Sequence, residues 1–147
     1  MAEKYVVFRV GEGNYSIPLE EVSQIIRYEN VRDVPAAPDF VDGVINVGGD
    51  VIPVVNLRTR FALDREEVTR KNRVIIVQKQ DISYGILVDS VREILDLDQD
   101  EVASEAASVF GMKSEFVRGI TKIRDYLLIL LDIFKILSTA PEIPIRE

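Results

Sequence analysis

Short apolar runs separated by polar turns cover most of the chain, and this spacing is typical of β-strands. The pattern predicts a strand over residues 4–10, a turn at residues 11–14 and a second strand over residues 15–19. Residues 43–57 have the clearest hairpin pattern, because two glycines and an aspartate at residues 48–50 suit a tight turn. Further strands are expected at residues 25–34, 74–78, 83–88 and 94–97, with a second hairpin over residues 120–131.

Helical spacing is confined to a few short segments. One helical turn is expected at residues 20–24, another at residues 101–107, and a short C-terminal helix at residues 132–138. The charged segment 63–72 has no regular period and is expected to connect two halves of the chain. Two prolines make residues 139–147 a loose C-terminal tail.

The chain contains a long internal repeat. Residues 15–26 recur at residues 84–95 with Tyr, Ile, Val and Ile in step, at an offset of 69 residues from Tyr15 to Tyr84. Phe40 recurs at Phe116, so the second half carries an insertion near residues 99–111. A unit of this length is too long for a solenoid repeat of ~20–50 residues. It indicates two similar lobes in one body.

The repeat predicts a mainly β fold. Each half supplies about five short strands, which can close into a small barrel that protects its edges. We expect a first lobe of about residues 15–72 and a second lobe of about residues 73–138. The equivalent first strand of each half leaves open an exchange of strand 4–10 between the lobes.

Composition excludes several functions. The chain has no cysteine and no histidine, so it lacks disulfides, thiolate metal sites and the commonest general base. Its formal charge of −7 disfavours contact with nucleic acid or anionic membranes. No apolar run approaches the ~20 residues of a membrane span, and the N-terminus lacks a signal-peptide pattern. We expect a cytoplasmic protein without membrane insertion, cofactor or metal.

Candidate catalytic motifs are weak. The adjacent Glu20 and Glu21 are expected to be a solvated turn, and the glycines at residues 11 and 13 a hairpin turn rather than a phosphate loop. The acidic run 96–101 lacks the spacing of a calcium loop. Three classes stay open: a partner-binding adaptor, a barrel that holds a small ligand in an internal cavity, and a carboxylate-based hydrolase. We expect no enzyme.

The repeated apolar positions are ambiguous. Val22 and its counterpart Val91, like Ile25 and its counterpart Ile94, fit either a barrel core or an apolar strip in a groove between the lobes. A helix of a partner could dock in such a groove.

Several segments resemble the family of chemotaxis coupling proteins called CheW-like. They are Gly43–Asn46 with the run from Val51 to Arg58, the run from Asn72 to Val77, Gly85–Asp89 and Leu128–Asp132. Each motif is common by itself, but the ordered set covers about residues 4–138, which places one domain at residues 1–138.

This resemblance implies two intertwined five-stranded barrels of the Src-homology-3-like type and a non-enzymatic adaptor. Members of the family join the cytoplasmic tip of methyl-accepting chemoreceptors to the regulatory domain of a histidine autokinase. Receptor-binding positions that carry over to this sequence are Val22, Gly43, Gly85, Val91 and Ile94. Kinase-binding residues cannot be carried over one by one.

Three residues depart from the family pattern. Gly48 stands where the family usually has an arginine, and Gln24 where it often has a glutamate that can pair with that arginine. Asn56 replaces the family's aspartate before Leu57 and Arg58. Loss of both members of an ion pair avoids an uncompensated charge.

Overall fold

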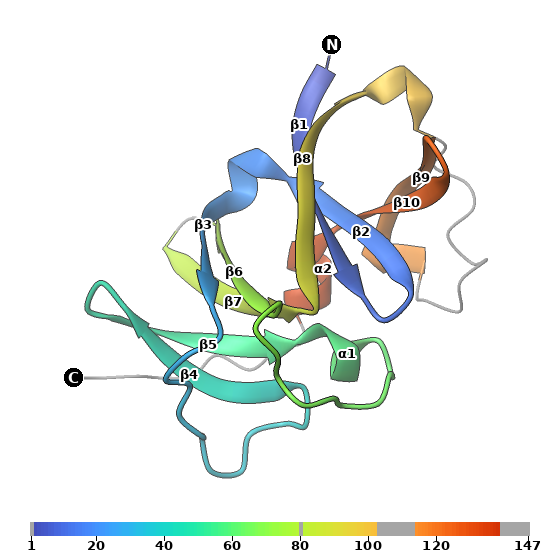
Figure 1. The fold of residues 1–147 in the computed structure, drawn as a ribbon. Coiled ribbons are helices and arrows are strands. Elements are labelled where there is room, and N and C mark those ends of the chain that lie inside the picture. The colour runs from blue at the N-terminus through green and yellow to red at the C-terminus, as the bar shows by residue number, and fades with distance from the viewer. Residues whose placement is uncertain (1, 80, 103–113, 139–147) are drawn as a thin grey trace.

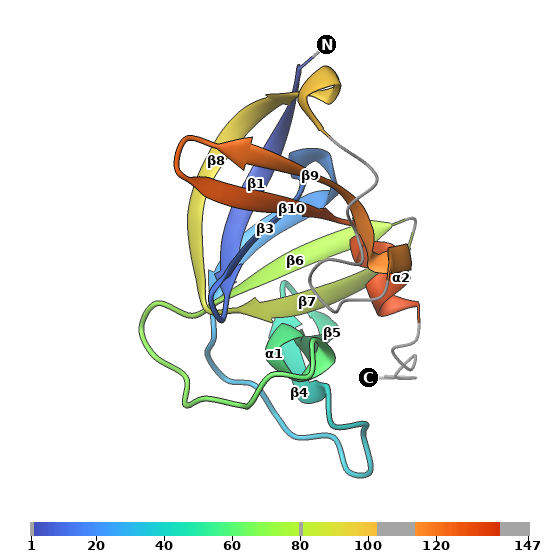
Figure 2. The same ribbon diagram turned by 90° about the vertical axis from the view of Figure 1, so that its right-hand side faces the viewer.

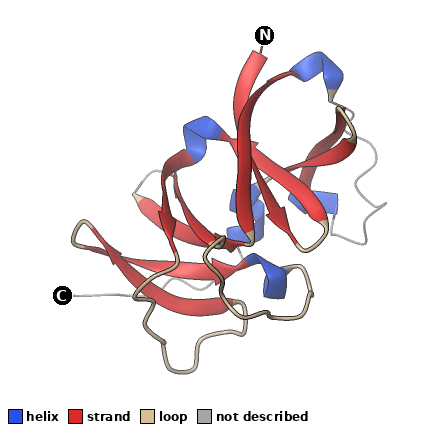
Figure 3. Ribbon diagram, in the orientation of Figure 1, coloured by secondary structure: helices blue, strands red, loops and turns tan. Residues whose placement is uncertain are grey.

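The computed structural model describes residues 2–79, 81–102 and 114–138, and its strands form two five-stranded sheets (Figure 1). The helical segments are short and lie at the ends of strands (Figure 3). The first half contains β1 (Ala2–Val10), β2 (Gly13–Pro18), the 3-10 helix η1 (Leu19–Glu21), β3 (Val22–Arg27), β4 (Val41–Val47), β5 (Asp50–Asn56) and α1 (Leu57–Arg60). The second half contains β6 (Arg73–Lys79), β7 (Ile82–Val88), β8 (Ser90–Asp98), η2 (Gln99–Glu101), η4 (Ser114–Phe116), β9 (Val117–Ile123), β10 (Tyr126–Leu131) and α2 (Ile133–Leu137).

The internal repeat produces the same strand order twice. One sheet has the order β8-β1-β2-β10-β9, and the other has the order β3-β6-β7-β5-β4. In the repeat, β1 to β5 correspond to β6 to β10, so exchanging each strand for its counterpart converts one order into the other. The central parallel pairs also agree in register, because Ser16 pairs with Leu130 and its counterpart Gly85 pairs with Val54.

Neither sheet is built from one half of the sequence. The first sheet combines β1 and β2 with β8, β9 and β10, and the second combines β3, β4 and β5 with β6 and β7. Figure 2 shows β1, β8, β9 and β10 stacked above β4, β5, β6 and β7. The mainly β class with two intertwined five-stranded units is confirmed.

The expected lobes, residues 15–72 and 73–138 with strand 4–10 exchanged, do not match these sheets. The exchanged unit is the whole hairpin of β1 and β2, which pairs antiparallel from Tyr5 with Pro18 to Val10 with Gly13. Two strands joined by a tight turn and paired along their length stay together, so β2 follows β1 into the other sheet.

A single cluster of buried side chains joins the two sheets. It includes residues from β1, β2, β9 and β10 on one side, from β5, β6 and β7 on the other, and from η4, α1 and α2: Val6, Phe8, Val10, Tyr15, Ile17, Val55, Leu57, Ile75, Val77, Tyr84, Ile86, Val88, Phe116, Ile120, Ile129, Leu131, Ile133, Ile136 and Leu137. Two smaller clusters, one around Val54 and one around Val7, lie within the separate sheets. Burial of one large apolar side chain stabilises the fold by about 1.5–3 kcal/mol, so the joint cluster makes the sheets depend on each other.

The local elements differ from the sequence expectations in four places. The helical turn expected at residues 20–24 is the shorter η1, and β3 already begins at Val22. The extended segment expected at residues 25–34 pairs only as far as Arg27, apart from an isolated bridge between Arg32 and Val44. The expected strand at 94–97 is the longer β8, and α1 was not expected.

The short C-terminal helix is confirmed as α2, with the Asp132 side chain accepting a hydrogen bond from the Lys135 backbone N–H at 3.2 Å. Most of the helical turn expected at residues 101–107 and the whole tail 139–147 lie outside the described residues.

Phe116 is expected to be a major contributor to stability, because it is 4% exposed in the joint cluster. Phe116→Ala should lower the free energy of unfolding by ~3–5 kcal/mol through lost burial and a cavity. Its counterpart Phe40 is half-buried, so Phe40→Ala should cost less. Urea denaturation followed by circular dichroism measures both values. Leu127→Ala, at a side chain that is 50% exposed, is the control and should change stability by about 0.5 kcal/mol or less. Equal losses for Phe116→Ala and Leu127→Ala would contradict the joint core.

Candidate functional site

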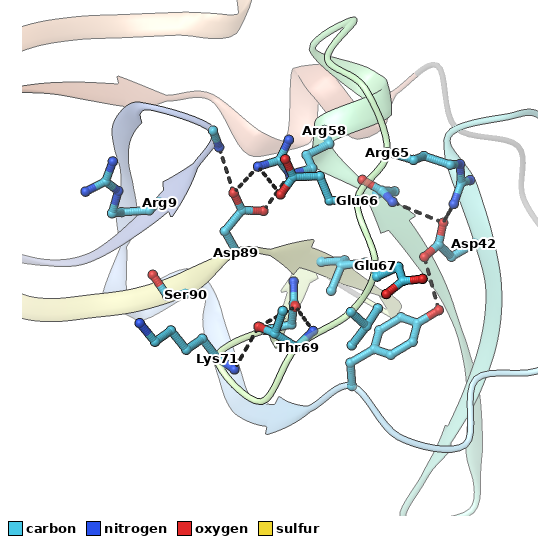
Figure 4. Close-up of a pocket in the computed structure, with 16 residues that line it drawn as sticks. Arg9, Asp42, Arg58, Arg65, Glu66, Glu67, Thr69, Lys71, Asp89 and Ser90 are labelled. Atoms are coloured by element: carbon cyan, nitrogen blue, oxygen red, sulfur yellow. Dashed lines mark hydrogen bonds and ion pairs between the residues drawn. The ribbon is translucent and has the colours of Figure 1, made fainter.

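Asp89 joins three parts of the chain at the boundary between the two sheets (Figure 4). Its carboxylate accepts two hydrogen bonds from Arg58, at 2.9 Å from Nε to Oδ1 and 2.7 Å from Nη2 to Oδ2. The backbone N–H of Gly11, in the turn of the first sheet, donates to Oδ2 at 2.8 Å. Hydrogen bonding to Asp89 raises the pKa of Arg58 above its ordinary value. A bidentate, charge-assisted pair therefore fixes α1 of one sheet against the hairpin of the other.

Asp42 forms a second polar centre nearby, and its side chain is only 5% exposed. Arg65 Nη1 donates to Oδ1 at 2.7 Å, Asn56 Nδ2 donates to the same oxygen at 3.3 Å, and the Tyr28 hydroxyl donates to Oδ2 at 3.1 Å. Burial and the charge of Asp42 raise the pKa of Tyr28 to about 12. The hydroxyl therefore stays protonated at neutral pH and remains a donor to the carboxylate.

Residues 62–71, which we call the strap, border a pocket of about 540 Å³ beside these two centres (Figure 4). Every residue of the strap is exposed. Polar contacts hold it: Arg65 Nη2 donates to the Asp39 carbonyl at 2.7 Å, and Arg58 lies 3.1 Å from the Glu66 carboxylate. The pocket walls carry charges of both signs, so the site suits polar contacts better than an apolar ligand.

The second half of the chain has the corresponding site with different charges. Arg118 occupies the repeat position of Asp42, and Asp132 occupies that of Asn56. Arg118 lies 3.8 Å from Asp132 and 3.7 Å from Glu21. At this second site Arg118 of β9 and Asp132 at the start of α2 supply both signs of charge from the second half, whereas Asp42 obtains its cation from the strap.

Glu21 lies in a pocket of about 340 Å³ at this second site, together with Lys79 and Phe134. Its Oε1 is buried and has no hydrogen-bond partner among the described residues. Burial raises the pKa of the Glu21 carboxyl, with the charge of Arg118 opposing the shift. The Lys79 ammonium lies 5.2 Å from the centre of the Phe134 ring.

Arg60 marks the point where the two repeats meet. Its guanidinium lies 5.1 Å from the ring centre of Phe40 and 5.1 Å from that of the counterpart Phe116. Its Nε also donates to the carbonyl of Ile136, which is the repeat counterpart of Arg60 itself, at 3.3 Å. This contact holds α1 against α2 and fixes the relative position of the two sheets.

The apolar positions expected to contact a receptor lie in two settings. Val22 and its counterpart Val91 are half-buried and pack against the joint core. Ile94 on β8 is 52% exposed, and its counterpart Ile25 on β3 is 36% exposed. Both β3 and β8 are edge strands of their sheets. The exposed isoleucines are therefore the members of the repeated set that a partner can reach directly.

The two glycines of the expected set are buried and have packing roles. At Gly43 the backbone φ is +152°, and a Cβ would collide with the Arg32 carbonyl oxygen. At Gly85 a Cβ would lie 2.7 Å from Cγ1 of Val74. Both positions require glycine for close approach of neighbouring backbone or side chains. Any influence on a partner would come through the shape of the second sheet.

Two of the three departures from the family pattern, Gly48 and Asn56, have local explanations. Gly48, with φ of +58°, and Gly49, with φ of +91°, form the tip of the hairpin of β4 and β5. Gln24 is exposed on β3. Asn56 is 5% exposed, and its amide donates to Asp42. An aspartate at that position would place a second carboxylate against Asp42, so the asparagine removes a repulsive contact.

The sequence did not reveal the centre formed by Asp42, Tyr28 and Arg65. A charged connector is usually solvated, and nothing in its local pattern predicts a contact with Asp42 across the fold. A signal was nevertheless present in the repeat, because Asp42 and Arg118 occupy equivalent positions with opposite charge.

Within the described ranges, no group of three or more potential ligand side chains is placed to hold a metal ion. Among the same residues, no helix is both long and apolar enough to cross a bilayer.

The fold and the site define a double-sheet β module made of two interleaved repeats. The family model described as CheW-like domain matches residues 4–140. The chain is 30% identical to a chemotaxis protein CheW of Treponema pallidum, over 91% of this chain and 81% of that protein. It is 31% identical to a chemotaxis protein CheW of Thermotoga maritima, over 95% of this chain and 89% of that protein.

A solved structure has the same fold. The crystal structure of the scaffolding protein TtCheW from Thermoanaerobacter tengcongensis aligns with a TM-score of 0.85 and 27% identity, covering 100% of this chain and 92% of that one. The chain therefore belongs to the CheW-like domain family, and the resemblance inferred from its strand motifs is confirmed. The family and its scaffold-named structure indicate a non-catalytic protein.

Glu21 gives a pH-dependent prediction. A carboxyl whose pKa is raised in the folded state weakens the fold once it ionises, because the unfolded chain releases the proton more readily. Glu21→Gln should therefore raise the thermal midpoint at pH 7, and the gain should disappear as the pH falls below the ordinary value of 4.5. Calorimetry across this range measures the effect. Glu20→Gln is the matched control, because Glu20 is exposed on the same turn. A Glu21→Gln protein that is less stable than the parent at pH 7 would show that the contact with Arg118 outweighs burial.

Proposed function

We propose that the protein is an adaptor that couples methyl-accepting chemoreceptors to the regulatory domain of a chemotaxis histidine kinase in the cytoplasm. The observation that carries this proposal is the match to the CheW-like family over nearly the whole chain, together with the scaffold structure that has the same fold. Its mechanism is bivalent binding. Two surfaces on one rigid body raise the effective concentration of each partner for the other.

The fold contributes rigidity to the proposed role of an adaptor with two binding surfaces. The joint core, the Arg58–Asp89 pair and the Arg60 contact tie the two sheets at three places. A body of this kind holds two partners at a fixed distance and angle. A change in the position of one partner is then transmitted as a change in contact geometry at the other.

The receptor surface that we propose includes Ile94 on β8, flanked by the half-buried Val91. A receptor tip is a helical hairpin, and an apolar residue on its surface needs an apolar partner. Val22, Gly43 and Gly85 would act by shaping the body behind the contact, because they are wholly or partly buried. No residues are assigned to the kinase contact.

The alternative of a small-ligand carrier has less support. Such a carrier would need an enclosed cavity of ~300–1,000 Å³ with mostly apolar walls. The pocket of about 540 Å³ instead has Asp42, Arg58, Arg65 and Asp89 among its lining residues. The buried clusters of both sheets consist of packed side chains.

Ile94 provides the test. Ile94→Asp should weaken binding of the receptor tip by tenfold or more, which is roughly 1.4 kcal/mol, because an unpaired charge would be desolvated at the contact. Affinity for the kinase regulatory domain should stay within about twofold of the parent. Isothermal titration calorimetry with both purified partners measures the two constants.

Leu127→Asp is the matched control, because Leu127 is equally exposed on β10. Circular dichroism establishes that each variant is folded. Unchanged receptor affinity in a folded Ile94→Asp protein would remove Ile94 from the receptor surface. Absence of binding to either partner by the parent protein would contradict the adaptor role itself.

A further inference from the structure

The carboxylate of Asp42 is a preformed acceptor for a guanidinium group. It is nearly buried, and the Tyr28 hydroxyl and the Asn56 amide hold its two oxygens from within the fold. Neither neutral donor supplies the positive charge that a buried carboxylate requires. Arg65 supplies it, with one nitrogen on Asp42 Oδ1 and another on the Asp39 carbonyl, each at 2.7 Å. Two separate acceptors, each engaged by a different nitrogen, suit the planar fork of arginine better than the single ammonium of lysine.

The segment that carries Arg65 is weakly attached. All residues of the strap are exposed, and the exposed fraction is 40% for Leu63 and 43% for Val68. The strap contributes no residue to the buried clusters. Its release from residue 64 onward would break the contacts of Arg65, the contact between Arg58 and Glu66 and the hydrogen bond from Arg58 Nη1 to the Asp64 carbonyl. The hydrogen bond from the Leu63 N–H to the Arg58 carbonyl anchors the start of the strap, and the release would remove no side chain from the buried clusters.

The floor of the pocket would keep its shape after such a release. Arg58 would still be held by its two hydrogen bonds to Asp89, and Asp89 by the N–H of Gly11. Asp42 would still accept from Tyr28 and Asn56. The remaining pocket, about 540 Å³ even with the strap in place, has room for a side chain and its neighbouring residues.

Only the site in the first half of the chain depends on a cation from a connecting segment, as the equivalent site in the second half shows. At the equivalent position stands a cation, Arg118, which lies 3.7 Å from Glu21 and 3.8 Å from Asp132, so no cation from a connecting segment is needed there. The first half has Asp42 and the neutral Asn56 instead, so its cation must come from another segment. The exchange of charge between equivalent positions creates an acceptor site on one side of the molecule only.

We propose that the Asp42 pocket is an arginine-receiving docking site, which Arg65 of the strap occupies in the free protein and from which an arginine on a partner protein displaces it. The partner is defined by its chemistry: an extended segment that presents an arginine. Because loss of Arg65 alone would leave a buried unpaired carboxylate, the strap exchanges only for another guanidinium, and this requirement makes the site selective. This inference does not rest on the coupling of receptor to kinase.

The test uses the full chain with Arg65→Ala and two small probes, N-acetylargininamide and N-acetyllysinamide. The variant should bind the arginine probe at least about tenfold more tightly than the lysine probe, because only the guanidinium engages two acceptors at once. Binding should raise its thermal midpoint and shift the amide resonances of Tyr28 and Asp42. Addition of Asp42→Asn to Arg65→Ala should abolish both effects. Arg70→Ala, at an exposed arginine of the same strap, should leave the protein unable to bind either probe.

A folded Arg65→Ala protein that does not bind the arginine probe, or binds both probes equally, would overturn the proposal. Retention of binding by the protein with both Arg65→Ala and Asp42→Asn would also overturn the proposal. If Arg65→Ala does not fold, the parent protein is titrated with an extended peptide that contains one arginine. Amide hydrogen exchange at Leu63, whose N–H donates to the Arg58 carbonyl at 2.7 Å immediately before the released residues, should then accelerate with the arginine peptide and not with its lysine form. Unchanged exchange in the strap would show that Arg65 is only a structural contact.

Discussion

The joint hydrophobic cluster is the constraint on which the rest of the structure depends. Each five-stranded sheet presents apolar residues to the other, and the cluster is completed by Leu57 of α1 and Ile133 of α2. Because the β1–β2 hairpin of the first half lies in the sheet completed by the second half, the chain cannot form either sheet from one repeat. Packing and topology therefore enforce the same result, which is one rigid body with two similar faces.

Charged groups then make the two similar faces different. Asp89 with Arg58, and Asp42 with Arg65, lie on one side of the molecule, while Glu21, Arg118 and Asp132 lie at the equivalent place on the other. A duplicated fold begins with two equivalent surfaces, and an adaptor needs surfaces that distinguish its partners. Changes in a few charged residues provide this distinction without disturbing the core, because specificity can come from unpaired or repulsive charges as well as from new contacts.

Much of the fold could be predicted from the sequence. Alternation of apolar residues located nearly every strand, and the repeat of Tyr15 at Tyr84 indicated a duplicated β structure. The boundary between the sheets could not be obtained in this way, because the period of a strand does not say which neighbour it pairs with. The helix α1 was missed because its first residue, Leu57, continues the apolar run of β5, and the three polar residues that follow are too few to show a helical period. The contact of Asp42 with Arg65 depends on a connector folding back across the structure, and local patterns carry no such information.

Two sheets that share one core must unfold together. Native-state hydrogen exchange by nuclear magnetic resonance tests this most directly, through the amides of β2 in the first sheet and β7 in the second. With a shared core, the most protected amides of both strands should exchange with the same free energy of opening, equal to that of global unfolding. A difference of more than about 2 kcal/mol between the two strands would show that one sheet opens while the other stays folded, and would contradict the shared core.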